Sequence, residues 1–146
     1  MSMSNAAEAA LQDLLFLNSA WANVGDASGL QPSAADGNFY VSLHTADPGE
    51  AGNQQTSEAT YTGYAREPIT RDAAGFTRSV STVSNTATVQ FDECTGGSNV
   101  ITHFAVGTLS TGTGMIVVSG ALNTPRTITA GITPLFNAGT LSATVD

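Results

Sequence analysis

The chain has 146 residues, which is enough for one domain with a core that needs neither disulfides nor a metal. Only 11% of the residues are charged, the formal net charge is −8, and there is no lysine. Because nucleic acids and anionic membranes are bound through basic side chains, neither partner is expected. The basic residues are Arg66, Arg71, Arg78 and Arg126.

Two further classes are excluded by what the sequence lacks. The single cysteine, Cys94, leaves no partner for an intrachain disulfide and no multi-cysteine zinc site. The N-terminus has acids and no positively charged leader, and no stretch approaches the ~20 apolar residues that span a bilayer. We therefore expect a protein without a secretory signal that is made in a cytosol and stays soluble.

Residues 5–24 are predicted to form the one helix, an N-terminal arm. Asn5 and Glu8 have the spacing of a capping box, and Gly25 can end the helix. We expect the apolar face of this arm to contact either the chain's own sheet or a neighbouring subunit. The residues that recur on that face at helical spacing are Leu11, Leu14, Leu15 and Trp21.

Residues 25–37 form a linker, and everything after it has the pattern of strands and turns. NFYVSLHT, residues 38–45, alternates apolar and polar side chains, and the polar loop over residues 46–60 follows it. Pro68 cannot donate to a central ladder, so it marks an edge or a bend. Short strands with glycine-bearing turns predict a mainly β fold, an antiparallel β-sandwich or jelly-roll-like domain over residues 38–146. With the helical arm, residues 1–146 are expected to be a single domain.

The first candidate site is His44-x-x-Asp47-x-x-Glu50, where a strand runs into a polar loop. The spacing matches no zinc or calcium motif, and strand geometry sends nearby side chains to different faces. An aspartate before Pro48 is a common way to open a turn, because its carboxylate can accept backbone N–H bonds. We therefore interpret the stretch as an ordered turn.

The second candidate site joins Cys94 and His103 with the acids Asp92 and Glu93. Thiol catalysis needs an activated thiolate close to the imidazole, and no local signature of such a site surrounds Cys94. Phosphate-cradling and dinucleotide-binding motifs are absent as well. No catalytic residue, cofactor or metal is expected.

Two strings resemble a family of small virion structural proteins from tailed bacteriophages: HTADPGEAG, residues 44–52, and YTGYAR, residues 61–66. The stretches LLFLNSAWANV, ECTGGSNVITHFAVGTLSTGTG and VSGALNTPRTITAGITPLFNAGTLSATVD are also similar, so the resemblance covers nearly the whole chain. Glu67-Pro68 depart from the family pattern, in which small apolar residues follow YAR. The resemblance implies a non-enzymatic virion component made in the cytoplasm of a host bacterium.

The leading hypothesis is a capsid decoration, or cement, protein that binds outside the head and stabilises the lattice of the major capsid protein. The alternative is a tail component, a fibre or baseplate adaptor, whose partners are tail proteins. In both, self-association into a homo-oligomer is expected, with a trimer as the simplest guess. The expected contact residues are Leu11, Leu14, Leu15, Trp21, Asp47, Pro48 and Glu50.

Two other classes of protein are less favoured by the sequence. A glycan-cleaving enzyme needs paired carboxylates in a cleft, and the clustered acids are Asp47, Glu50, Asp92 and Glu93. A carbohydrate-binding module needs exposed aromatic rings, for which Tyr40, Tyr61 and Tyr64 are the candidates. Those rings are equally suited to packing between strands.

Overall fold

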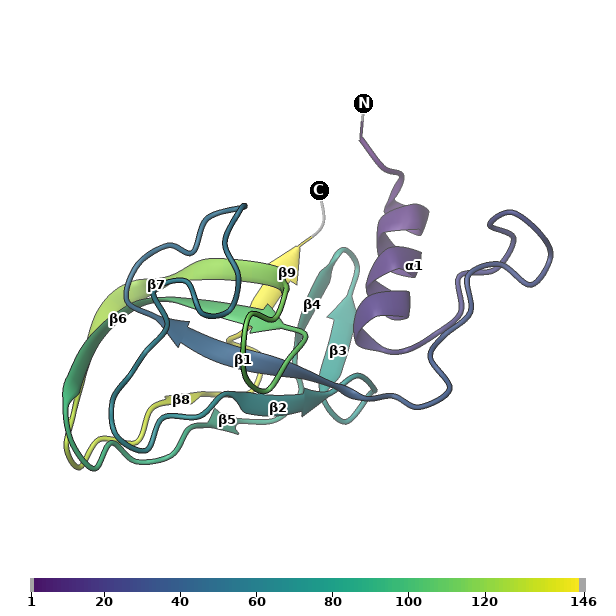
Figure 1. Cartoon of the computed structure of the whole chain (residues 1–146). Helices are drawn as coiled ribbons and strands as arrows, with labels where there is room; N and C mark the ends of the chain where they lie inside the picture. The colour runs from purple at the N-terminus through teal and green to yellow at the C-terminus, as the bar shows by residue number, and fades with distance from the viewer. Residues whose placement is uncertain (1, 145–146) are drawn as a thin grey trace. The chain divides into compact units, whose positions relative to one another are not determined.

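The computed structural model describes residues 2–144 (Figure 1). One N-terminal helix precedes the strands. The pairs β1–β6, β3–β4, β4–β9 and β6–β7 are all antiparallel. This confirms the predicted fold class, mainly β with an N-terminal helix. The elements are α1 (Asn5–Phe16), β1 (Asn38–His44), β2 (Glu67–Thr70), β3 (Phe76–Ser79), β4 (Thr82–Asn85), β5 (Val89–Gln90), β6 (Ser98–Gly107), β7 (Ile116–Thr129), β8 (Leu135–Phe136) and β9 (Ser142–Thr144).

The chain divides into two compact units, each assembled from separate stretches of sequence. The first unit comprises Met1–Asn38, Ile69–Thr88 and Phe136–Asp146, and the second comprises Phe39–Pro68 and Val89–Leu135. The expectation that residues 1–146 behave as a single domain stays a prediction. No helix in residues 2–144 is long and apolar enough to cross a membrane.

The first unit packs α1 against a three-stranded sheet with the order β3-β4-β9. Ser4 is the N-cap, and its hydroxyl oxygen accepts a hydrogen bond from the Ala7 N–H at 3.3 Å. Phe16 meets Phe76 of β3 edge to face, with ring centroids 5.1 Å apart. One helical face, spaced i, i+4, i+8, is therefore buried, and it consists of Glu8, Gln12 and Phe16.

The helix ends at Phe16, eight residues earlier than the expected residue 24, and one side chain distant in sequence caps its C-terminus. Asn18 takes a left-handed conformation with φ 49°, a common way to stop a helix. The Arg71 guanidinium donates to the free carbonyls of Leu14 and Leu15 at 3.0 and 2.7 Å. Trp21 consequently lies outside the helix and pairs through its backbone with Leu30. The connecting segment starts at residue 17 and not at residue 25.

Most residues of a four-stranded sheet belong to the second unit; its order is β2-β1-β6-β7, in which β1 and β6 are central. Val41 and Leu43 of β1 are fully buried, as are Ile101 and Ala105 of β6. Pro68 lies on β2 at one edge, where its missing N–H is tolerated, as predicted. β7 forms the other edge (Figure 1).

Candidate functional site

The stretch that opens with His44 folds back on the end of β1 as a closed loop. The backbone N–H groups of Thr45 and Ala59 donate to the carbonyls of Ser57 and Leu43, both at 2.8 Å. The Asp47 carboxylate accepts the Gly49 N–H at 2.8 Å, which is the turn-opening role expected of an aspartate before proline. Asp47 and Glu50 are exposed, whereas Pro48 is buried.

The histidine at the start of this loop is a buried hydrogen-bonding residue. The His44 side chain is wholly inaccessible, with Nδ1 2.8 Å from the Thr56 carbonyl and Nε2 2.8 Å from the Ser42 hydroxyl. Because a carbonyl only accepts, Nδ1 carries the proton and Nε2 accepts from Ser42. Burial lowers the pKa of His44, which favours the neutral imidazole. The Ser–His pair is closed to substrate, and it fixes the loop to the sheet.

A buried ion pair closes the far end of the same segment. Arg66 binds the Glu58 carboxylate with two parallel bonds, Nε to Oε1 at 2.7 Å and Nη2 to Oε2 at 2.8 Å. The Tyr64 hydroxyl donates to the same Oε1 at 2.9 Å and accepts the Leu43 N–H at 3.1 Å. Only 3% of the Arg66 side chain and 16% of the Glu58 side chain are exposed. The hydrogen bond to Glu58 is the largest cause of a raised Arg66 pKa.

The same arginine reaches the turn between β6 and β7. Arg66 donates to the carbonyls of Leu109 and Gly112 at 2.9 and 2.8 Å. Gln54 makes a second connection, because its Oε1 accepts the Leu109 N–H at 3.0 Å and its Nε2 donates to the Tyr40 carbonyl at 3.1 Å. Side-chain hydrogen bonds thus connect the loop after β1 to the turn after β6. We call this set Gln54, Glu58, Tyr64 and Arg66 the loop clamp.

The clamp requires glycines beside Gln54. A Cβ added to Gly107 or to Gly114 would collide with the Gln54 side chain. Neither glycine has a positive φ, so close approach and not backbone conformation accounts for them. Neither a motif nor a residue spacing in the sequence marks Gln54, Glu58 or Arg66 as part of such a network. The signal available in the sequence was the scarcity of basic residues, four in all, of which Arg66 is one that the fold buries.

The second candidate site does not assemble. Cys94 is fully buried and its Sγ lies 3.3 Å from the Gly96 carbonyl, whereas His103 is hydrogen-bonded at Nδ1 to the Thr102 hydroxyl at 2.9 Å. Asp92 and Glu93 are exposed. Within residues 2–144, no three side chains of His, Cys, Asp or Glu converge as metal ligands.

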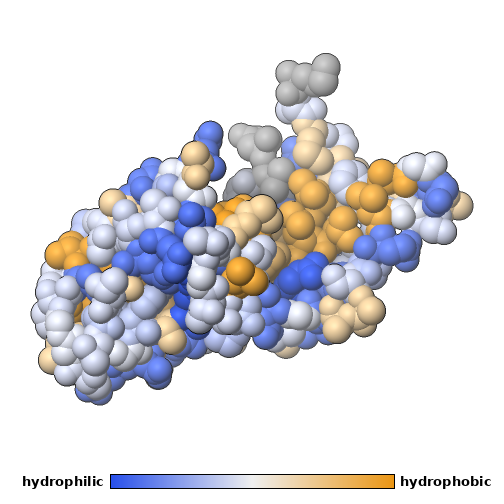
Figure 2. All heavy atoms as spheres, viewed as in Figure 1, coloured by the Kyte–Doolittle hydropathy of each residue, from blue (hydrophilic) through white to orange (hydrophobic). Residues whose placement is uncertain are grey.

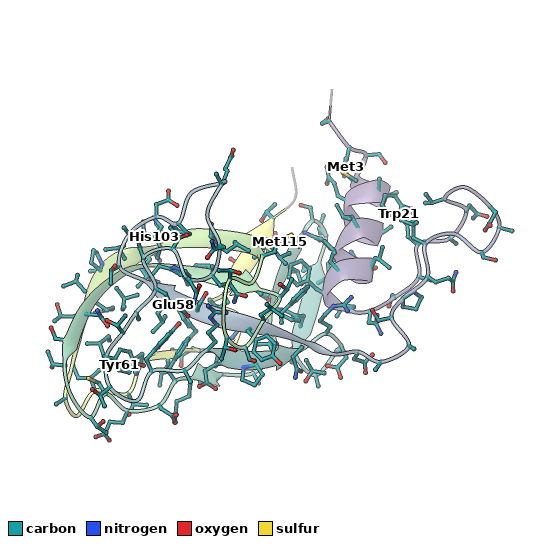
Figure 3. All side chains as sticks on the ribbon, viewed as in Figure 1. Met3, Trp21, Glu58, Tyr61, His103 and Met115 are labelled. Atoms are coloured by element: carbon teal, nitrogen blue, oxygen red, sulfur yellow. The ribbon has the colours of Figure 1, made fainter. Side chains whose placement is uncertain are left out.

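Of the three tyrosines, Tyr61 and Tyr64 pack against aromatic rings of the second unit, whereas Tyr40 is half-buried. Tyr61 is 3% exposed, and its ring meets that of Tyr64 edge to face at 5.4 Å. Tyr64 in turn stacks on Phe91 at 6.1 Å. Burial raises the pKa of Tyr61 to about 12, and its hydroxyl donates to the Asp92 carbonyl at 3.2 Å. Figure 3 labels Glu58 and Tyr61, which lie in the segment between β1 and β2.

The candidate contact residues of the N-terminal arm have a different environment. Leu11, Leu14 and Leu15 are half-buried, because α1 turns its Glu8, Gln12 and Phe16 face toward the sheet. Gln12 donates to the Ser81 carbonyl, while its buried Oε1 has no hydrogen-bond partner in the described chain. The helix therefore buries polar groups and leaves leucine surface partly uncovered.

We compared the chain with protein-family models and with curated proteins. A family model described as "Podophage GP4 fiber I protein gp80" matches residues 2–144. A search of curated proteins found no relative. The match confirms the resemblance to tailed-phage virion structural proteins, and it covers both compact units.

Proposed function

The chain belongs to the podophage GP4 fibre I protein gp80 family, and from this premise we propose that it is a structural, non-enzymatic component of a podophage tail fibre. The observation that carries the proposal is the extent of the match, residues 2–144. Capsid decoration, the leading hypothesis from the sequence, is not confirmed. The tail component named as its alternative is the better supported of the two.

The loop clamp supports a structural role. The two strings that carry the family resemblance supply His44, Tyr64 and Arg66, and all three side chains are engaged in hydrogen bonds within the unit. Because Arg66 and Glu58 are bound to each other by two hydrogen bonds, neither is free for acid–base chemistry on a substrate. A fibre module that carries mechanical load benefits from loops fixed in this way.

We assign attachment to a neighbouring tail protein to the leucine surface of α1. Leu11, Leu14 and Leu15 remain half-exposed, and Figure 2 shows apolar residues gathered around α1. Uncovered apolar side chains on a helix are typical of a surface that another protein completes. Trp21 is also half-exposed but belongs to the following segment, so it would extend this surface and not share the helical face.

Immunogold electron microscopy of purified virions tests the location. Antibody raised against the chain should label the tail, and label spread over the head would overturn the tail-fibre proposal in favour of decoration. Virions produced without the protein and complemented with variants test the attachment surface. Leu11→Asp and Leu14→Asp should reduce incorporation, whereas Asn23→Asp adds the same charge at an exposed position and should not. Circular dichroism of each purified variant separates lost attachment from lost folding.

A further inference from the structure

The turn between β3 and β4 holds a valine in a backbone conformation that valine rarely adopts. Ser79 pairs with Thr82, so Val80 and Ser81 form a two-residue hairpin loop. Val80 has φ 57°, in the left-handed region that Asn, Asp or Gly usually occupies at the first position of such a loop. The other non-glycine residues of the described chain with positive φ are Asn18, Asn23 and Ser57. Among residues 2–144, Val80 is therefore the one β-branched residue under this strain.

Burial does not compensate for the strain at Val80. The side chain is 73% exposed, more than any other large hydrophobic side chain in residues 2–144. A valine stabilises a fold through the apolar surface that it buries, and here little is buried. Asparagine adopts the left-handed conformation more readily than valine does. We therefore expect the free chain to be more stable with asparagine at position 80.

Side chains from α1 and β3, which pack together, hold the loop in this conformation (Figure 1). Arg78 Nη1 donates to the Val80 carbonyl at 3.0 Å, and its Nε and Nη2 bind the Asp13 carboxylate at 2.6 and 2.9 Å. The buried amide of Gln12 donates to the Ser81 carbonyl. Strained residues persist where the surrounding structure fixes them, and they are concentrated at functional sites. The loop is thus fixed with the valine side chain exposed to solvent.

The chemistry of the loop limits the kind of partner that it fits. Both loop carbonyls already accept hydrogen bonds from Arg78 and Gln12, so they do not require a donor from outside. Arg78 is the only charged residue in residues 76–85, and it is paired with Asp13. What remains for a partner to recognise is an apolar side chain. Anionic lipid headgroups would repel a chain with a net charge of −8, so a protein pocket is favoured over a membrane.

We propose that Val80 inserts into an apolar pocket of the neighbouring tail protein. The identity of this partner rests on the proposed function. Because Gln12 and Asp13 fix the loop to α1, Val80 adds a preset contact to the leucine surface of that helix. A loop that is ordered before binding loses less conformational entropy than a flexible one. Burial of the side chain in the partner offsets the backbone strain, so the valine serves assembly and not folding.

Two measurements on Val80→Asn test the inference, and they should change in opposite directions. The Tm of the purified full chain, followed by the fluorescence of Trp21 in the same unit, should rise by about 2–4 °C because strain is relieved. Virions are then assembled with equal amounts of wild-type and variant chains, and mass spectrometry measures the share of each. The Val80→Asn share should be at least about tenfold lower, as expected when one buried valine side chain is lost.

Two control variants separate this contact from general effects of the substitution. Val100→Asn removes the same side chain from β6, where Val100 is 50% exposed and its φ is not positive. Its Tm should not rise, because asparagine is disfavoured in strands, and its share in virions should stay within about twofold of wild type. Val80→Leu keeps an apolar side chain on the loop and should be incorporated within about threefold of wild type.

Three results would overturn the inference. A Val80→Asn chain that melts below the wild-type chain would show that the valine serves folding. Equal shares of the wild-type and Val80→Asn chains in virions would show that no partner uses the side chain. Cosedimentation with phosphatidylethanolamine–phosphatidylglycerol vesicles that is lost in Val80→Asn would make a lipid surface the occupant. Gold label on the head, with Val80→Asn still excluded from virions, would refute the tail-fibre proposal and keep Val80 as a virion contact.

Discussion

The two units each contain one arginine bound bidentately by a carboxylate, and the two pairs differ in burial. In the second unit Arg66 and Glu58 have side chains that are 3% and 16% exposed. In the first unit Arg78 binds Asp13 of α1 with Nε to Oδ1 at 2.6 Å, and the side chains are 27% and 26% exposed. The two ion pairs therefore have nearly the same bond geometry, but one is buried and the other is partly exposed to water.

The difference shows why distance alone does not rank ion pairs. In a half-exposed pair, water weakens the attraction between the two charges, so the pair adds only about 0–1 kcal/mol to the free energy of unfolding. A buried pair contributes little net stability as a whole, but removal of one partner leaves an uncompensated charge in the interior. Arg66 adds two carbonyl bonds that connect loops far apart in sequence, whereas the extra bond of Arg78 is to Val80, two residues away.

The largest effect is expected for Arg66→Ala. The change leaves the Glu58 carboxylate with the Tyr64 hydroxyl but without its cation, and it leaves the Leu109 and Gly112 carbonyls without the Arg66 donor, so it should lower the free energy of unfolding by about 3–5 kcal/mol. Urea unfolding followed by the near-ultraviolet circular dichroism of the tyrosines measures it, since Tyr40, Tyr61 and Tyr64 all lie in the second unit. Arg66→Lys keeps the positive charge but cannot bind the carboxylate with two parallel bonds, so it should recover only part of the lost free energy of unfolding. A loss below 1 kcal/mol would place this pair in the same class as Arg78–Asp13.

Tyr64→Phe probes the hydroxyl of the clamp while it keeps the ring that stacks on Phe91. The variant removes the hydroxyl that donates to Glu58 beside Arg66, and it leaves the Leu43 N–H without its acceptor. We therefore expect the free energy of unfolding to fall by about 1–3 kcal/mol. The same tyrosine-monitored unfolding serves as the measurement. Tyr40→Phe is the matched control. Equal stability of the Tyr64→Phe and Tyr40→Phe proteins would contradict the role of the Tyr64 hydroxyl.

A pH effect of smaller size is expected from His44. Desolvation lowers the pKa of the folded-state imidazole below its ordinary value of 6.5, so the unfolded chain binds the proton more readily. The stability contributed by neutral His44 is present above pH 6.5 and decreases as the pH falls below it. Nearby Glu58 opposes this pKa shift, while Arg66 and His103 reinforce it. Unfolding midpoints between pH 5 and 7.5 should show a shallower decline in His44→Asn, and an unchanged decline would contradict the assignment.

The smallest effect is expected for Arg78→Ala. Loss of a half-exposed pair should cost about 0–1 kcal/mol, and the cost should shrink further in high salt. Trp21 is the only tryptophan and lies in the first unit, so its fluorescence follows this unfolding transition. A loss as large as that of Arg66→Ala would mean that burial does not separate the two pairs.

The same probes compare the two units directly. If residues 1–146 are a single cooperative domain, Trp21 fluorescence and tyrosine circular dichroism should give coincident transitions in the wild-type chain. Arg66→Ala should then shift both signals together. Two separated transitions would mean that the units unfold independently and would refute the single-domain prediction.

Features that depend on near neighbours in the chain were predictable from the sequence. Alternation along residues 38–45 marked β1, Asp47-Pro48 marked the turn, and Pro68 marked an edge strand, because each signal acts within a few residues. The absence of lysine and the single cysteine are likewise properties of the chain alone.

Contacts between residues far apart in the sequence could not be predicted and are known from the folded chain alone. Arg66 reaches Leu109 and Gly112 because the hairpin turn after β6 is brought beside the loop after β1, and that adjacency depends on strand order. Arg71 ends α1 from more than fifty positions away, where the local pattern continued to residue 24. Apolar periodicity indicates that a strand or helix has a face to bury, but not which element covers it. For the same reason, the pattern could not show that Leu11, Leu14 and Leu15 of α1 would stay half-buried.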